Sequence, residues 1–404
     1  MLKGKNILLG VSGSVSAYKA ADLCSKLKHM EADVNVVMSR HAPEFVSPVT
    51  FDALSHHRTV TGSFEKEHTC KIDHIRLAEK ADVFVVAPAS ADIIGKLANG
   101  LGDDALSSTA LAVTCPKLLA PAMNSKMYEN PAVQRNLKLL LEDGWEIIEP
   151  LEGKLACGAV GKGKLEEVSR ILEYIEIAAS NKKDLKGKKV LVTAGPTEEE
   201  IDPVRFITNH STGKMGYEVA KAAVRRGGEV TLVTGPVNIE TPVKTNVIKV
   251  RSADEMFAAV KERLDSTDII IMTAAVADFK PAERNSSKIK KENGKEEIRL
   301  KGTEDILAYT GNHRNNNQIV CGFCMETEDL IKRAEEKRKR KKADLIVANS
   351  LFDKGAGFAV DTNVVTFITE QGNKKLPLMK KSEVAETLIT EIAGIIKEKK
   401  EKEK

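Results

Sequence analysis

The sequence has few aromatic residues and no long apolar run, and both shortages exclude broad classes of function. Aromatic residues make up 4% of the 404 positions, whereas proteins that bind single-stranded nucleic acid stack the bases on aromatic side chains. The longest apolar stretches, such as residues 83–87 and 269–272, are far too short to cross a membrane. We therefore expect neither a nucleic-acid partner nor a membrane partner.

Neither sign of charge dominates, and cysteine is sparse. Lys and Arg number 62 against 58 Asp and Glu, which gives no global attraction to an anionic polymer or surface. The six cysteines are scattered and lack the spacing of a disulfide framework. Because the N-terminus also lacks a secretory pattern, the sequence predicts a cytoplasmic protein.

Cys321 and Cys324 form a C-x-x-C, the spacing of many zinc and redox sites. They lie in the apolar stretch IVCGFC, which indicates a buried strand. Residues three apart on a strand point to opposite faces, and no second Cys/His pair at metal spacing accompanies them. A structural role is favoured over a zinc site.

The same pattern occurs twice, in residues 5–13 and in residues 188–196. In each, an apolar segment typical of a strand is followed by a Gly-rich turn and then by a predicted helix. The strands predicted in the first half are residues 6–11, 34–38, 83–87, 117–120 and 146–148. Those predicted in the second half are residues 190–194, 229–234, 247–250, 269–274, 319–323, 345–348 and 364–369. Because helix-length segments separate them, both halves are expected to form mostly parallel sheets of the α/β class.

The polar, basic segment of residues 180–189 has no apolar period and precedes a new strand at once. We place a boundary there, which predicts domains at 1–182 and 183–404. The first is expected to be a flavodoxin-like, doubly wound parallel sheet and the second a Rossmann-like α/β domain. In each, the first helix start would present unpaired backbone N–H groups to an anion.

Residues 10–18, GVSGSVSAY, combine a Gly-rich turn with several hydroxyl groups at a helix start. Such a turn is typical of the phosphate cradle of flavodoxin-like flavin sites. The spacing lacks a G-x-G-x-x-G, so a mononucleotide is favoured over a dinucleotide. Taken alone, the motif is explained equally well by a plain tight turn.

Several polar residues of the first half follow predicted strands or lie in Gly-rich sequence. Residues 88–92, PASAD, occupy a strand carboxyl end, the usual ligand position in open α/β sheets. Asn124 follows the next strand in PAMN, and His74 comes just before a predicted helix, where a cap or core role is the commoner one. Cys157 lies in a Gly-rich stretch typical of a flap that closes over a site, although a buried cysteine is the ordinary alternative.

Together, GVSGSVSAYK, His74, APAS, PAMN and ACG-x-x-G-x-G resemble the flavin-dependent phosphopantothenoylcysteine decarboxylases. The resemblance implies FMN as cofactor. It implies that His74 assists oxidation of the substrate thiol side, Asn124 holds the carboxylate, and Cys157 returns a proton to the ene-thiolate after CO₂ leaves. The FMN contacts that it implies are Ser12, Gly13, Ser14, Ser16, Ser39, Ser90 and Ala91.

The second half concentrates amide, imidazole, hydroxyl and amine groups in residues 209–216, NHSTGKMG, at a helix start. This density is typical of a phosphate nest, but it is not a Walker A loop. Asp278 follows a strand end, in a position suited to a sugar or Mg²⁺. The charged segment of residues 283–301 reads as a flap, and Lys337 and Lys341 share one helix face in a basic run.

The motifs AGPT, DPVR, TNHSTGKMG, AAVADF, KIKK and GF-x-x-ET resemble phosphopantothenate–cysteine ligase, and the tandem order is that of the bifunctional coenzyme A biosynthesis proteins. The resemblance implies that CTP activates 4′-phosphopantothenate as an acyl-cytidylate, after which the amine of cysteine forms the amide. It implies Asn209 and Lys288 as catalytic residues and Mg²⁺ near Asp278. The CTP contacts that it implies are Ala274, Asp278, Lys288, Glu304, Asp305, Ile306, Leu307, Phe323, Lys337 and Lys341.

The pattern departs from the family at three positions. Glu304 stands where a proline often precedes the aspartate, and Cys324 and Met325 replace small residues. CTP follows from the resemblance alone, because no residue pattern excludes ATP. The resemblance also implies trimeric decarboxylase domains and dimeric ligase domains, hence a large homo-oligomer, with a dodecamer as one form.

Three other functions each match part of the sequence. A two-domain dinucleotide oxidoreductase would explain both strand–turn–helix starts but lacks the fingerprint in each. A flavin-binding regulatory subunit is opposed by the joint presence of His74, Asn124 and Cys157. Nucleic-acid binding through the basic helix would require strongly salt-dependent affinity.

Overall fold

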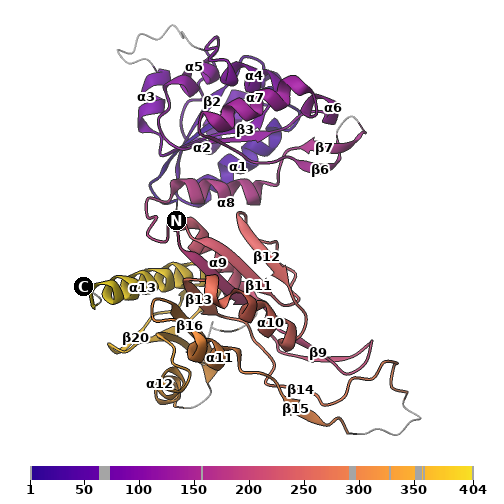
Figure 1. Ribbon diagram of the computed structural model, residues 1–404. Helices are drawn as coiled ribbons and strands as arrows, with labels where there is room; N and C mark the ends of the chain where they lie inside the picture. Colours follow the sequence, from indigo (N-terminus) through magenta and orange to yellow (C-terminus); the bar gives the residue numbers. More distant parts are fainter. Residues whose placement is uncertain are drawn as a thin grey trace. The chain divides into compact units, whose positions relative to one another are not determined.

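The structure is a computed structural model that describes residues 2–62, 73–155, 158–290, 297–326, 329–350, 357 and 360–402. The chain divides into two compact units, Met1–Asn181 and Lys182–Lys404 (Figure 1). Each unit is described by itself. Within the described ranges, no helix combines the length and the hydropathy that a bilayer span requires.

The first unit is built on one five-stranded parallel sheet with the strand order β2-β1-β3-β4-β5. Its strands are β1 (Asn6–Val11), β2 (Asp33–Met38), β3 (Val83–Ala89), β4 (Lys117–Pro121) and β5 (Trp145–Ile147). This is the flavodoxin-like order, in which ligands bind where the order reverses, between β1 and β3. The predicted fold class of the first half is confirmed.

Helices cover both faces of this sheet because successive strand residues point to opposite sides. Ile7 and Leu9 of β1 pack in one core cluster, and Leu8 packs in the other. The first cluster takes in α1 (Ala17–His29), α2 (Pro48–Ser55) and α8 (Val168–Ala179). The second takes in α3 (Asp73–Lys80), α4 (Ala91–Ala98), α5 (Ala105–Ala112) and α7 (Pro131–Glu142).

An antiparallel hairpin outside the sheet was not predicted from the sequence. Its strands are β6 (Leu151–Lys154) and β7 (Val160–Lys164). Cys157 follows β6 in the sequence and lies outside the described residues. A short helix, α6 (Ser125–Tyr128), follows the predicted PAMN segment.

The second unit contains an eight-stranded sheet with the order β12-β11-β8-β13-β16-β17-β19-β20. Its parallel strands are β8 (Lys189–Ala194), β11 (Glu229–Thr234), β12 (Thr245–Lys249), β13 (Ile269–Met272), β16 (Ile319–Glu326) and β17 (Leu345–Ser350). In order of appearance these six run 3-2-1-4-5-6, the Rossmann arrangement, and the order reverses between β8 and β13. The antiparallel strands β19 (Val365–Ile368) and β20 (Asn373–Lys375) extend the sheet beyond β17.

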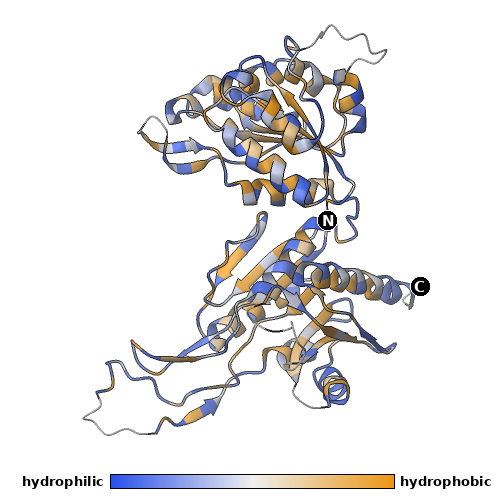
Figure 2. Ribbon diagram, turned by 180° about the vertical axis from the view of Figure 1, so that it is seen from behind, coloured by the Kyte–Doolittle hydropathy of each residue, from blue (hydrophilic) through white to orange (hydrophobic). Residues whose placement is uncertain are grey.

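The helices of the second unit are α9 (Lys214–Arg225), α10 (Ala253–Arg263), α11 (Ile306–His313), α12 (Leu330–Arg340) and α13 (Lys381–Lys402). Three short ribbons complete it: β9 (Glu198–Glu200) with β10 (Phe206–Thr208), β14 (Phe279–Pro281) with β15 (Leu300–Gly302), and β18 (Thr362–Asn363) with β21 (Met379–Lys380). Figure 2 shows apolar colour concentrated on the sheet strands, as expected where helices cover both faces.

Every predicted strand is present, and two local expectations need correction. His74 is the second residue of α3, whereas the sequence placed it just before a helix. The charged segment 283–301 ends in β15, which pairs with β14, so at that end the expected flap is a regular ribbon. Cys321 and Cys324 are both buried on β16, as predicted.

Candidate functional sites

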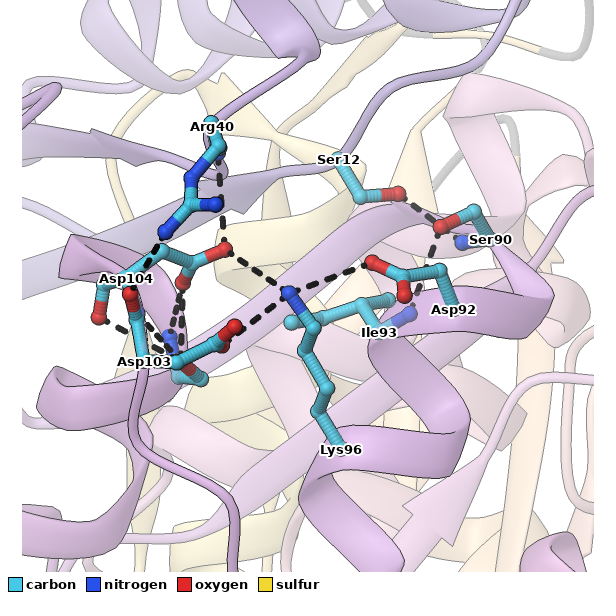
Figure 3. Close-up of polar contacts among 9 residues, drawn as sticks. Ser12, Arg40, Ser90, Asp92, Ile93, Lys96, Asp103 and Asp104 are labelled. Atoms are coloured by element: carbon cyan, nitrogen blue, oxygen red, sulfur yellow. Dashed lines mark hydrogen bonds and ion pairs between the residues drawn. The ribbon is translucent and has the colours of Figure 1, made fainter.

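The first site lies at the carboxyl ends of β1 and β3, where the strand order of the sheet reverses. Ser12 links the two strand ends there. Its hydroxyl group donates to the Pro88 carbonyl oxygen at 2.8 Å. The same hydroxyl oxygen accepts from the Ser90 backbone N–H at 2.8 Å (Figure 3). Ser12 is fully buried. The predicted turn after β1 and the predicted PASAD corner after β3 are therefore bonded to each other.

The other predicted cofactor contacts come from the same three strand ends. Ser39 follows β2 and donates its backbone N–H to the Val11 carbonyl oxygen at 3.0 Å. Ser90 caps α4 by accepting from the Ile93 backbone N–H at 3.4 Å, and Ala91 begins that helix. A Cβ on Gly13 would lie 3.2 Å from the Cβ of His41. These corners present backbone N–H groups and hydroxyl groups, which suit a phosphate.

A charged network that was not predicted from the sequence lies next to this site. Lys96 of α4 places its Nζ 3.0 Å from Asp103, 3.4 Å from Asp92 and 3.6 Å from Asp104 (Figure 3). Burial lowers the pKa of Lys96, but the hydrogen bond to Asp103 and the attraction of the carboxylates outweigh it, so the pKa is raised. The lysine is charged and ties α4 to the loop before α5.

Asp104 extends the network to the residue after Ser39. Its carboxylate caps α5 by accepting from the Ser107 backbone N–H at 2.8 Å, and it accepts from the Arg40 backbone N–H at 3.4 Å. Asp92 and Lys96 are four apart on one helix, so the spacing in the sequence could have revealed that pair. It gave no sign of the link to Asp104 or Arg40, which depends on the tertiary fold.

Asn124 lies beside the β6–β7 hairpin. Its side chain caps α6 by accepting from the Lys126 backbone N–H at 2.9 Å. The hairpin packs on this segment through glycines, since a Cβ on Gly161 would lie 2.8 Å from the Cβ of Ser125. The Met123 backbone N–H also donates to the Gly163 carbonyl oxygen at 3.0 Å. The strand that follows Cys157 in the sequence is thus held against the Asn124 segment.

A side-chain clamp reinforces that contact. Tyr128 of α6 donates to the Glu149 carboxylate at 2.9 Å, and Lys162 of β7 donates to the same oxygen at 2.6 Å. The Lys162 ammonium group also lies 5.4 Å from the centre of the Tyr128 ring. His74, half-buried on α3, is the remaining predicted catalytic residue of this unit.

Replacing Ser12 with alanine is expected to destabilise the first unit and to weaken flavin binding. The substitution leaves the part-buried Ser90 N–H without the Ser12 oxygen and removes the buried bond from the Ser12 hydroxyl group to the Pro88 carbonyl oxygen. An unsatisfied buried group costs about 1–3 kcal/mol. Chemical denaturation followed by circular dichroism, with flavin absorbance of the purified protein, measures both effects. Ser108→Ala, which removes an exposed hydroxyl bonded to Gly102, is the matched control; equal stability of both variants would contradict the assigned role.

The second site is a cavity of about 620 Å³ at the carboxyl ends of β8, β13 and β16. Among the described residues, it is lined by nearly all of the predicted nucleotide contacts. Those lining it are Ala274, Asp278, Glu304, Asp305, Ile306, Leu307, Phe323, Lys337 and Lys341, together with Asn209. The structure thus brings together residues that are more than a hundred positions apart in the chain.

Hydrogen bonds fix the two loops that carry the acidic residues. Asp305 caps α11 by accepting from the Ala308 backbone N–H at 2.9 Å, and it pairs with Lys341. Thr303 donates its backbone N–H to the Asp278 carbonyl oxygen at 3.0 Å. Within the described ranges, no group of three or more His, Cys, Asp or Glu side chains is arranged to hold a metal, so a Mg²⁺ ion at Asp278 would need ligands from a bound phosphate chain.

Asn209 is held by two backbone oxygens of the loop after β13. Its side-chain amide donates to the Ala275 carbonyl oxygen at 3.0 Å and to the Val276 carbonyl oxygen at 3.3 Å. These bonds fix the orientation of the Asn209 amide at the cavity wall. Its carbonyl oxygen is thereby held in one direction.

Lys288 is the predicted residue that the cavity lining does not include. The neighbouring Ile289 is anchored, because its N–H donates to Asp202 at 3.1 Å and its carbonyl oxygen accepts from Arg205 at 2.9 Å. Asp202 and Arg205 belong to the predicted DPVR motif. That motif therefore holds the KIKK segment, a role that the sequence did not reveal.

Gly216 allows α9 to lie close to the sheet at the cavity. A Cβ there would lie 2.3 Å from the Thr273 hydroxyl oxygen and 2.5 Å from the Cβ of Ala194. Gly216→Ala is expected to lower the free energy of unfolding by about 1–3 kcal/mol through overpacking. Gly394→Ala on α13, where a Cβ meets open space, should instead be neutral or stabilising by about 0.5–1 kcal/mol. Urea denaturation of both variants tests this. A free energy of unfolding of Gly216→Ala equal to that of the wild-type protein would contradict the close approach.

Comparison with known proteins gives matches over both units. The family model described as "Flavoprotein" matches residues 1–180, and that described as "DNA/pantothenate metabolism flavoprotein C-terminal domain" matches residues 185–395. A crystal structure of the C-terminal domain of a coenzyme A biosynthesis bifunctional protein CoaBC is 39% identical, covers 54% of this chain and 99% of that chain, and has a TM-score of 0.46. The FMN-dependent cysteine decarboxylase SpaF is 33% identical, covers 44% of this chain and 97% of that chain, and has a TM-score of 0.39.

Curated relatives match almost the whole chain. The coenzyme A biosynthesis bifunctional protein CoaBC of Escherichia coli (strain K12) is 39% identical over 98% of this chain and 99% of that protein. The protein of the same name from Bacillus subtilis (strain 168) is 48% identical over 98% of this chain and 99% of that protein. With this identity over both units, the chain belongs to the family of coenzyme A biosynthesis bifunctional proteins.

Proposed function

We propose that the chain carries out two consecutive steps of coenzyme A biosynthesis. The second unit joins 4′-phosphopantothenate to cysteine, and the first unit decarboxylates the product to 4′-phosphopantetheine. The observation that carries the proposal is the near full-length identity of 48% to the Bacillus subtilis bifunctional protein. The geometry supports the proposal, because Ser12 and Ser90 in the first unit and the cavity in the second unit lie at the carboxyl ends of strands where the strand order reverses.

In the proposed ligation, the carboxylate of 4′-phosphopantothenate attacks the α-phosphate of CTP, and pyrophosphate leaves. The amine of cysteine then attacks the acyl-cytidylate carbonyl, which forms the amide and releases CMP. The oriented amide of Asn209 suits the reacting acyl group, and Lys288 on the anchored KIKK segment would supply positive charge to the phosphates. Mg²⁺, bound to Asp278 and the phosphates, would neutralise further charge.

The choice of CTP over ATP also belongs to the proposal. The loop of Asp305, Ile306 and Leu307 and the side chain of Phe323 line the cavity where a base and ribose would lie. The pairing of Lys341 with Asp305 holds a cation beside them. Glu304, Cys324 and Met325, the three departures noted in the sequence, line the same cavity and are the positions from which altered base selectivity would arise.

In the proposed decarboxylation, the first unit binds FMN at the corners after β1, β2 and β3. The buried Ser12 bridge and the Gly13 turn fit a phosphate held by backbone N–H groups. FMN would supply the electron sink that lets the cysteine carboxylate leave as CO₂. Asn124 would hold that carboxylate, His74 would accept a proton, and Cys157 would return one to the product carbon.

A homo-oligomer forms the last part of the proposal, with trimeric first units and dimeric second units as the family resemblance implies. Exposed apolar side chains support an interface on the first unit. Val15 and Tyr18, next to the Ser12 turn, are each 62% exposed, and Val49 on α2 is 69% exposed. Sedimentation analysis of the full chain would measure the assembly.

Mass spectrometry of the products tests both activities together. The purified protein is mixed with 4′-phosphopantothenate, cysteine, Mg²⁺ and either CTP or ATP. We expect 4′-phosphopantetheine with CTP. Accumulated phosphopantothenoylcysteine would overturn the decarboxylase assignment, formation with ATP alone would overturn CTP, and no product with either nucleotide would overturn the proposed function.

A further inference from the structure

One aspartate next to the predicted FMN contacts connects three separate segments of the first unit. The Asp104 carboxylate is almost fully buried, with 4% of its side chain exposed. Its Oδ1 accepts from the Ser107 backbone N–H and from the Ser107 hydroxyl group, both at 2.8 Å, and so caps α5. Its Oδ2 accepts from the Arg40 backbone N–H at 3.4 Å and lies 3.6 Å from the Nζ of Lys96 (Figure 3). The cap of α5 and the links to the other two segments therefore depend on different oxygens.

Both partners of this Oδ2 lead to corners that carry predicted FMN contacts. Arg40 directly follows Ser39, the predicted contact after β2. Lys96 belongs to α4, which Ser90 caps and Ala91 begins. Because a short helix moves as one body, the ion pair of Lys96 also fixes the corner where α4 starts. One carboxylate oxygen thus links the corner after β2 to the corner after β3.

Lys96 also balances the charge at the start of α4. Asp92 is the second residue of this helix, and a carboxylate there repels a phosphate bound at the same corner. The Nζ of Lys96 lies 3.4 Å from Asp92 and 3.0 Å from Asp103. Without this ammonium group, three carboxylates would lie next to a site that is proposed to bind an anion.

We propose that Lys96 and Asp104 are positioning residues of the flavin site, which hold the corners after β2 and β3 at the spacing that the FMN phosphate requires. This inference rests on the proposed binding of FMN by the first unit. Backbone N–H groups bind a phosphate where several of them converge, and each corner supplies only part of the set. Neither residue is among the predicted contacts, so both act through the corners that they hold.

A capping role alone is the alternative for Asp104, because an N-cap aspartate stabilises its own helix. Asparagine is an equally good N-cap residue. Asp104→Asn therefore keeps an acceptor for the Ser107 N–H. It replaces Oδ2 with an amide group, which can neither accept from the Arg40 N–H nor pair with Lys96. The substitution separates the two roles.

The experiment measures the affinity of the full-length protein for FMN and for riboflavin, which lacks the phosphate, by equilibrium dialysis with flavin absorbance as the readout. The variants are Asp104→Asn, Lys96→Met and the charge-preserving Lys96→Arg. Asp82→Asn is the matched control, because Asp82 links β1 and β3 at their opposite ends. There its carboxylate accepts from the Asn6 backbone N–H at 2.8 Å and pairs with Lys5 at 3.3 Å. Circular dichroism checks that each variant is folded.

Asp104→Asn and Lys96→Met should each weaken FMN binding about tenfold or more, the size of a lost charged hydrogen bond. Riboflavin binding should change less than twofold, because the two corners are held in place for the phosphate. Lys96→Arg should bind FMN within about threefold of the wild-type protein, and Asp82→Asn should bind both flavins as the wild-type protein does. A general loss of stability would not change the ratio of the FMN affinity to the riboflavin affinity.

Equal weakening of FMN and riboflavin binding would show that the network supports only the fold of the first unit, and it would overturn the assignment. Unchanged FMN affinity in both Asp104→Asn and Lys96→Met would also overturn it, while the proposed function stands if the wild-type protein binds FMN. A wild-type protein that binds neither flavin would reject the proposed function of the first unit, and the assignment with it.

Discussion

Asn209→Ala is expected to abolish amide formation while the same protein still decarboxylates phosphopantothenoylcysteine that is supplied to it. The Asn209 amide is held by the carbonyl oxygens of Ala275 and Val276 at the wall of the ligase cavity. A fixed amide that stabilises developing charge in acyl transfer contributes about 10²–10³-fold to the rate. We therefore expect a loss of that size in the release of CMP from CTP, measured by chromatography.

The control for this variant is Asn246→Ala, which changes an exposed asparagine on the edge strand β12. It should form the amide at the wild-type rate. A ligation rate within threefold of wild type in Asn209→Ala would remove Asn209 from the chemistry. Equal loss of both half-reactions would mean that the variant fails to fold, which circular dichroism would reveal.

The sequence predicted the sheet strands well because they are long, apolar and bounded by turn residues. β1 and β11 begin and end where the sequence placed them. The cores follow from the same alternation, since Leu8 and Leu9 go to opposite faces of the first sheet. Long apolar strands carry their own signal because burial on both faces requires apolar side chains throughout.

The short ribbons carried no such signal. β9 is a run of three glutamates, and β15 is an exposed three-residue strand. Neither shows the alternation that identifies a strand, because each is held by pairing and by contacts from elsewhere in the fold. The same holds for β6 and β7, where Gly153 faces Gly161 across the hairpin.

The candidate sites were predictable where one motif supplied several residues in sequence. The Ser12 turn and residues 209–216 are of this kind. The pairing of Lys96 with Asp104 was not, because Lys96 lies on α4 and Asp104 caps α5. Contacts of this type depend on strand order, which hydrophobic periodicity does not encode.

Gly163→Ala is expected to lower the rate of decarboxylation strongly and to leave the rate of ligation unchanged, so that phosphopantothenoylcysteine accumulates. Gly163 has φ of 145°, and a Cβ there would lie 2.3 Å from the Met123 carbonyl oxygen. The backbone must therefore move, which breaks the bond from the Met123 N–H to the Gly163 carbonyl oxygen. The β6–β7 hairpin would then lose its contact with the segment that carries Asn124.

The chain offers a matched control for this substitution on the facing strand of the same hairpin. A Cβ on Gly153 meets open space, so Gly153→Ala should keep both activities. If Cys157 acts from this hairpin, Gly163→Ala should lower the decarboxylation rate by about a hundredfold, since a misplacement of about 1 Å has effects of that size. Flavin absorbance should stay at the wild-type level, because Ser12 and the corners after β1 and β3 are untouched. A Gly163→Ala protein that decarboxylates as fast as Gly153→Ala would show that the position of this hairpin does not limit the reaction.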